Sequence, residues 1–285
     1  MSSTMLRRPS LTHRERALLV AFASLSVAAF VGPALPTPES AAAPFADDRA
    51  WYGLPNAMDV LSNLAFAAIG VWGLLQLRRL DRTREAAQDA LPASGATRQA
   101  SDNALDCAWL FFAGLILTAV GSAFYHLHPD SPRLAADRAG MAVAFAGIVG
   151  VAVCDRVSAR AGWPAAWFTL AGGLLAVGVF HETGNVLPWG LVQFGGMALL
   201  LVLALAKPMG GGIGLKPGWV LFLYGLAKLF ELSDQAIFEA TNELMSGHTL
   251  KHLTAALAAL PVLHAVRAMG RQPLRQDPGT PAMSA

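Results

Sequence analysis

The sequence has few charged residues. Only 14% of its 285 residues are Asp, Glu, Lys or Arg, whereas an ordinary soluble domain contains about a quarter. Hydrophobic residues make up 54% of the chain. So small a charged fraction leaves too little solvent-facing surface for a soluble domain of this length. The composition therefore argues against a soluble globular protein.

Several motifs and features are also missing. The sequence contains neither GxSxG nor HExxH, so neither a serine-nucleophile hydrolase nor a zincin is indicated. The two cysteines, Cys107 and Cys154, lie near helix ends expected to face the cytoplasm, where a disulfide is not expected. We interpret them as small packing residues. No basic patch suggests a nucleic-acid partner.

Long apolar runs dominate what is present. About 20 apolar residues in succession span a bilayer as a helix. The chain contains eight candidate spans, at roughly 17–36, 58–77, 105–127, 134–153, 163–181, 187–206, 219–239 and 248–267. The sequence therefore predicts an all-α, polytopic transmembrane bundle, with a seven-helix core and one extra N-terminal helix.

The positive charges alternate between the loops. Arg and Lys are concentrated before the first span and after the second, fourth, sixth and eighth, whereas the opposite loops hold only Arg49 and Arg133. Cytoplasmic loops are enriched in Lys and Arg. We therefore expect both termini in the cytoplasm, in a bacterial inner membrane.

Three regions follow from this layout. Residues 1–57 hold a basic segment, the first span and an outer loop; 58–267 form the membrane domain; 268–285 form a disordered cytoplasmic tail. The first span, with a basic start and small residues after it, also fits a cleaved secretory signal peptide. Either assignment leaves the orientation of the remaining seven spans unchanged.

Nearly all ionisable residues inside the spans lie toward the predicted outer ends. Such residues are costly in a bilayer, usually face the bundle interior, and are functional candidates. They are Asp59, His126, Asp137, His181, Glu231, Asp234, His248 and His252. We expect Glu231 and Asp234 to support the helices around the site, and His128 and His181 to lie outside it.

His126, His248 and His252 form the predicted metal site. His248 and His252 are four residues apart, so they share one helix face. Neutral imidazoles suit zinc, and three protein ligands with one open position are the catalytic arrangement. Asp137 is placed to orient or deprotonate a zinc-bound water. Ser122, one helical turn before His126, is placed to hydrogen-bond a developing oxyanion.

These motifs resemble a known family. Ser122-x3-His126, Asp137 eleven residues later and His248-x3-His252 on the last span are similar to the alkaline ceramidases. They are also similar to the wider CREST superfamily, which includes adiponectin-receptor-like proteins and GPI-remodelling enzymes. Asp59-x2-Ser62-Asn63 resembles the opening motif of that superfamily. The resemblance covers residues 58–267.

The resemblance implies a membrane-embedded hydrolase. Its seven-helix core would bind Zn²⁺ through His126, His248 and His252, with Ser122 and Asp137 beside the metal. The implied reaction is hydrolysis of a ceramide-like amide bond, releasing a fatty acid and a sphingoid base. The implied partners are a lipid substrate and the membrane.

Three questions remain open from the sequence. Alkaline ceramidases have an acidic, tryptophan-containing calcium site before the first core helix; the corresponding stretch here is 47–51, and Asn56 replaces a Glu. Whether calcium binds, which lipid is cleaved and which oligomer forms are not determined. A receptor-like or sensing protein of the same zinc fold is an alternative, as is a transporter using Glu231 and Asp234 as a proton path.

Overall fold

The computed structural model describes residues 10–36, 45–89, 100–209 and 212–271. Within these ranges the regular structure is helical, apart from one isolated bridge between Trp51 and Leu54. The described helices are α1 (His13–Val31), α2 (Ala57–Ser62), α3 (Leu64–Asp89), α4 (Ala100–Leu127), α5 (Ser131–Arg156), α6 (Ala159–Thr183), α7 (Leu187–Leu205), α8 (Pro217–Leu232), α9 (Asp234–Ala240), α10 (Gly247–Leu257) and α11 (Leu260–Met269). The predicted all-α bundle is confirmed. The proposed tail at 268–285 lies mostly outside the described residues.

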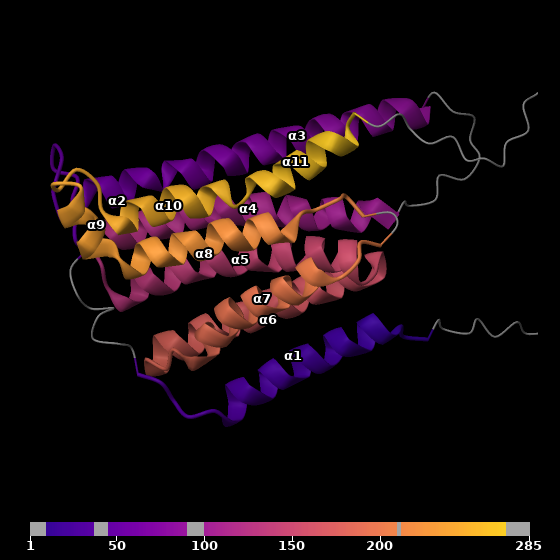
Figure 1. Cartoon of the computed structure of the whole chain (residues 1–285), viewed down its shortest axis with the longest axis horizontal. Coiled ribbons are helices and arrows are strands. Elements are labelled where there is room, and N and C mark those ends of the chain that lie inside the picture. Colours follow the sequence, from indigo (N-terminus) through magenta and orange to yellow (C-terminus); the bar gives the residue numbers. More distant parts are fainter. Residues whose placement is uncertain (1–9, 37–44, 90–99, 210–211, 272–285) are drawn as a thin grey trace, which may run out of the picture.

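The helices form a bundle of long rods lying roughly alongside one another (Figure 1). Three rods consist of two helices in succession: α2 with α3, α8 with α9, and α10 with α11. Short irregular steps separate them, at Asn63, Ser233 and 258–259. Counted this way, the rods correspond one to one with the predicted spans. α1 lies at the edge of the bundle, beside α6 and α7.

Six stretches of the described chain are long and apolar enough to cross a membrane, which indicates a membrane protein. They are Ala57–Ala86, Asp102–Leu127, Ser131–Arg156, Ala159–Thr183, Leu187–Leu205 and Gly247–Met269. Two predicted spans are not among them. α1 begins with three charged residues, Arg14, Glu15 and Arg16. α8 has 16 residues, about 24 Å of helix, and α9 continues its rod.

Small residues let α4 and α5 approach closely. A Cβ atom on Gly147 would lie 2.3 Å from the backbone nitrogen of Phe111, and one on Gly121 would lie 2.6 Å from the carbonyl oxygen of Ala136. Such contacts are typical of helix interfaces in membranes. The contact at Gly121 places the following residue, Ser122, beside the turn of α5 that carries Asp137.

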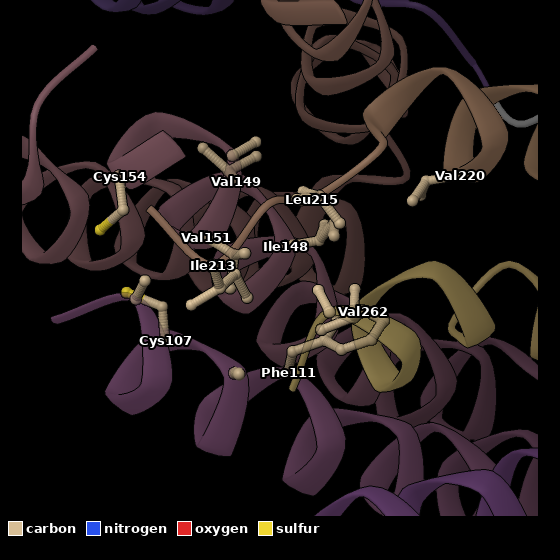
Figure 2. Close-up of a cluster of buried hydrophobic side chains, with 14 of the residues drawn as sticks. Cys107, Phe111, Ile148, Val149, Val151, Cys154, Ile213, Leu215, Val220 and Val262 are labelled. Carbon is tan, nitrogen blue, oxygen red and sulfur yellow. The ribbon is translucent and has the colours of Figure 1, made fainter. Parts of the chain in front are cut away.

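Both cysteines lie in the buried core (Figure 2). They are free and buried, as the sequence predicted. The Cys107 sulfur packs against Gly150, where a Cβ atom would lie 2.6 Å away, and the Cys154 sulfur packs against Gly162 at 2.1 Å from such an atom. The thiols therefore fill space that glycines on neighbouring helices leave open.

The two ends of the bundle differ in charge. One end carries the start of α1, the ends of α3, α5, α7 and α11, and many of the described Arg and Lys residues, which lie at or near these helix ends. Here Arg14 donates to the carbonyls of Arg156 and Lys207, and Arg160 pairs with Glu15 at 2.6 Å. The opposite end carries α9 and residues 45–56. Which end faces the cytoplasm remains a prediction from the charge pattern.

Candidate metal centre

Three histidine rings meet near the less basic end of the bundle. His126 lies in the last turn of α4, and His248 and His252 lie in the first two turns of α10. All three are buried, and each offers a ring nitrogen such that these atoms lie within 4.8 Å of one another. The ring centroids are 4.8 to 5.0 Å apart. The structure therefore brings together the three predicted ligands, although His126 precedes the other two by more than 120 residues in sequence.

The nitrogen atoms of these rings fit a metal site. The Nδ1 atom of His126 is buried and has no hydrogen-bond partner among the described residues. His252 uses Nδ1 to contact the Ser62 hydroxyl at 2.8 Å, which leaves Nε2 for a ligand. Metal-binding histidines usually engage their second nitrogen in this way, which fixes the ring orientation. An orphaned buried imidazole nitrogen beside two further imidazoles matches the donor set that zinc prefers.

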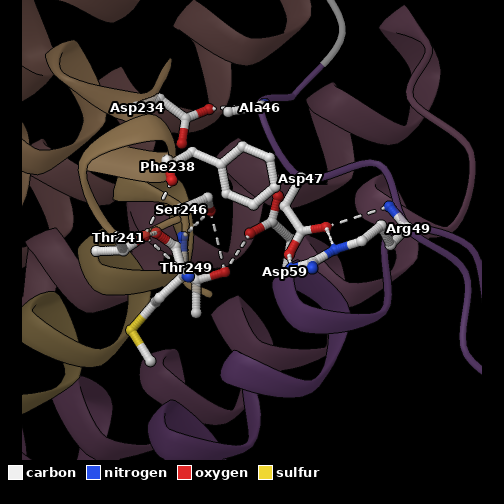
Figure 3. A network of polar contacts seen from close by, with 10 residues as sticks. Ala46, Asp47, Arg49, Asp59, Asp234, Phe238, Thr241, Ser246 and Thr249 are labelled. Carbon is white, nitrogen blue, oxygen red and sulfur yellow. Dashed lines mark hydrogen bonds and ion pairs between the residues drawn. The ribbon is translucent and has the colours of Figure 1, made fainter. Parts of the chain in front are cut away.

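Asp234 anchors the helix that carries two of the histidines. Its carboxylate accepts the backbone N–H of His248 at 2.7 Å. It also accepts the backbone N–H of Ala46 at 3.1 Å (Figure 3). Ser246 caps α10 by accepting the N–H of Thr249 at 3.0 Å. A Cβ atom at Gly247 would lie 2.3 Å from the carbonyl oxygen of Phe230, so only glycine permits this approach of α10 to α8.

A second anchor ties α10 to α2. The Thr249 hydroxyl donates to the buried carboxylate of Asp59 at 2.8 Å (Figure 3). The Asn63 side chain donates to the backbone carbonyl of Asp59 at 2.8 Å. The motif Asp59-x2-Ser62-Asn63 therefore supports the metal site through two contacts with α10. Asp59 accepts a hydrogen bond from Thr249, and Ser62 contacts His252.

Residues 45–56 lie over the histidines. The Phe45 ring packs against His126 and His248, with centroid distances of 4.5 and 4.7 Å. The Asn56 side chain donates to the His126 carbonyl at 2.8 Å. Arg49 binds the Asp47 carboxylate through two nitrogens at 2.7 Å (Figure 3), and this pairing raises the pKa of Arg49. The Arg49 guanidinium therefore neutralises Asp47, which belongs to the stretch 47–51 that corresponds to the calcium site of the alkaline ceramidases.

Ser122 and Asp137 face the same cavity as the histidines. Ser122 is buried on α4, one turn before His126, and the Asp137 carboxyl lies close enough to its hydroxyl to interact. The structure therefore places both residues beside the cluster. His128 and His181 are exposed and lie outside it, as expected.

Lys251 is a further polar residue at the site that was not predicted from the sequence. Its ammonium lies 2.9 Å from Nε2 of His248 and 2.9 Å from Glu231, which also pairs with Lys228 at 2.5 Å. An ammonium can only donate, so Nε2 of His248 accepts in this contact. A metal that binds Nε2 of His248 would replace the Lys251 ammonium there. Lys251 would keep its ion pair with Glu231. The only indication in the sequence was its position: Lys251 is a charged residue three positions after His248 on an otherwise apolar helix.

The cavity beside the cluster has a volume of about 660 Å³ and extends into the bundle. Its polar end holds the histidines, Ser122, Asp137 and Lys251, and most of the remaining lining is apolar. Representative apolar lining residues are Phe66, Phe111, Leu115, Ile148, Leu200 and Val220. A cavity of this size suits a drug-sized ligand, and the distribution of its lining residues suits a molecule with a polar end and an apolar tail.

No protein-family model matches the chain, and no curated protein matches it. The resemblance to the alkaline ceramidases thus remains a prediction from the motifs.

Proposed function

We propose that the protein is a zinc-dependent membrane hydrolase that cleaves an acyl amide bond, as in ceramide, in a lipid. This proposal rests on the position of the histidine cluster relative to the cavity. Three buried histidines with closely spaced nitrogens lie at the polar end of a largely apolar cavity, and Ser122 and Asp137 line the same cavity. An acyl chain fits the apolar part, and its amide group would then lie at the polar end.

His126, His248 and His252 would hold the metal. Zinc bound by three imidazoles supplies Lewis acidity and brings the pKa of a coordinated water near neutrality. Asp137 would accept a proton from the water that attacks the carbonyl carbon, and would return it to the nitrogen as the C–N bond breaks, because a carboxylate within hydrogen-bond reach can act as base and then as acid. Ser122 would donate a hydrogen bond to the oxygen of the scissile carbonyl as it gains negative charge. The products are a fatty acid and an amine.

The surroundings favour a hydrolase over a transporter. Glu231 is paired with two lysines, and Asp234 accepts two backbone N–H groups. Carboxylates committed in this way serve structure rather than a proton path. A receptor-like protein of the same fold would use the same cavity, and turnover distinguishes it from an enzyme.

A hydrolysis assay tests the proposal. Purified protein in detergent, loaded with zinc, is incubated with ceramide and with other N-acyl lipids, and the released fatty acid is quantified. We expect release by the wild type and loss of release in His126→Ala. Zinc binding by a wild type that hydrolyses none of these lipids would instead support the receptor-like alternative.

A further inference from the structure

Arg138 is a cation inside the bundle that the site described above does not use. It lies on α5, directly after Asp137, and lines the same cavity. Its guanidinium stacks over the Phe180 ring at 4.0 Å from the centroid and lies 5.8 Å from that of Trp189. Both rings are buried, and contact with aromatic rings leaves the N–H groups of a guanidinium available to other partners.

Those N–H groups have no hydrogen-bond partner in the part of the chain that the structure describes. The Nη1 atom is buried without a hydrogen bond, and no ion pair within residues 10–36, 45–89, 100–209 and 212–271 includes Arg138. The other cations near this end differ. Lys228 and Lys251 share Glu231, and Arg133 pairs with Asp130. Asp137 attracts Arg138 without a hydrogen bond to it.

A guanidinium without a hydrogen-bonded partner is costly inside a membrane bundle, and such a residue is a functional candidate. Arginine presents a rigid fork of donors that matches the two oxygens of a carboxylate or phosphate. Stacking on aromatic rings orients that fork without using its donors. An anionic oxygen group on a molecule that enters the cavity would supply the partner that Arg138 lacks among the described residues.

We propose that Arg138 binds a carboxylate or phosphate on the head group of the lipid substrate, so that the protein selects anionic N-acyl lipids over neutral ones. This inference rests on the proposed function, because it places the scissile bond beside Ser122 and Asp137. The acyl chain occupies the apolar part of the cavity, and the head group extends toward α6 and α7, where Phe180 and Trp189 lie.

Two matched pairs of lipids test this selection. N-palmitoylglycine is compared with its uncharged amide, N-palmitoylglycinamide, and N-palmitoylphosphoethanolamine with N-palmitoylethanolamine. We expect the wild type to prefer the anionic member of at least one pair by roughly 10- to 100-fold in kcat/KM, the size of a charge-assisted hydrogen bond. No preference in either pair, or preference for the neutral members, overturns the proposal.

The variants separate recognition from folding. Arg138→Gln should abolish the preference for anionic lipids. Arg133→Gln is the control and should keep that preference. Arg133 lies on the same helix and also stacks on an aromatic ring, that of Phe124. Arg138→Lys keeps the charge but loses the fork, so it should retain only part of the preference. An undiminished preference in Arg138→Lys or Arg138→Gln contradicts the assignment. The lysine variant keeps the test decisive where the glutamine variant does not fold.

A binding measurement distinguishes failure of this inference from failure of the proposed function. The melting temperature of each variant is measured with each lipid, and separately with inorganic phosphate or acetate. Where no lipid is hydrolysed, greater stabilisation by the anionic lipids that depends on Arg138 still supports the head-group site. Equal stabilisation within both pairs overturns it. Arg138-dependent stabilisation by the free anions alone overturns the lipid as the source of the anion.

Discussion

Replacing Asp234 with alanine tests how the metal-site helix is held. The carboxylate accepts two backbone N–H groups, from His248 at 2.7 Å and from Ala46 at 3.1 Å. The first bond resembles a helix cap, whose loss costs about 1 kcal/mol and up to about 2. The second ties residues 45–56 to α9. A hydrogen bond to a charged group contributes about 1.5–3 kcal/mol when buried, and Asp234 is only half-buried.

With that discount, the two bonds together stabilise the fold by about 2–4 kcal/mol. For a chain of this size, each kcal/mol shifts the melting temperature by about 2–4 °C. We therefore expect Asp234→Ala to melt roughly 5–10 °C below the wild type. Asp234→Asn retains one acceptor oxygen and should lose about half as much. Glu239 is an exposed acid bonded to Gln235 on the same helix, so Glu239→Ala serves as the control and should shift the melting temperature little.

The assay uses the protein's own thiols. Cys107 and Cys154 are free and buried in the core, so a thiol-reactive fluorogenic dye reports unfolding in detergent. All variants are heated at the same rate in the same detergent. A melting temperature for Asp234→Ala that matches those of Glu239→Ala and the wild type would refute the anchoring role assigned to Asp234.

Three further predictions concern the site and its orientation. Ser122→Ala and Asp137→Asn should keep the metal, measured by elemental analysis, yet lose about 10²–10³-fold in hydrolysis rate; metal loss would mean that they act on the metal site itself. Lys251→Met removes a competing donor from His248, so it should tighten zinc binding about tenfold in a chelator competition, for a contact of about 1.4 kcal/mol; weaker binding would mean that Lys251 supports the site. Single cysteines at exposed His128 and Leu244 should react with an impermeant thiol reagent in intact cells, whereas one at Glu85 should not; the reverse pattern would invert the topology.

The sequence predicted what depends on periodicity. A helical spacing of four and the position of each polar residue along its span were enough to place His126, His248 and His252 at one end of the bundle. The structure adds the breaks at Asn63 and Ser233, which divide the predicted spans. These breaks could not be predicted, because neither position carries a proline or glycine.

The supporting contacts were harder to predict. Lys251 and Arg138 are single charges on apolar helices, and nothing in their spacing indicates what they face. Lys251 meets Glu231 across two helices, and Arg138 meets aromatic rings from α6 and α7. Asp130, which reads as an ordinary loop acid, caps α5 by accepting the N–H of Arg133. Such roles depend on tertiary neighbours rather than on local sequence.

Zinc content tests the central claim most directly. Purified wild-type protein and the variants His126→Ala, His248→Ala and His252→Ala are dialysed against trace zinc and analysed for metal and protein concentration. His181→Ala serves as the control, because His181 is exposed and lies outside the cluster. We predict about one zinc per chain in the wild type and in His181→Ala, and loss of most of it in each of the other three variants. Full zinc content in those three variants would show that the buried histidines are not the ligands.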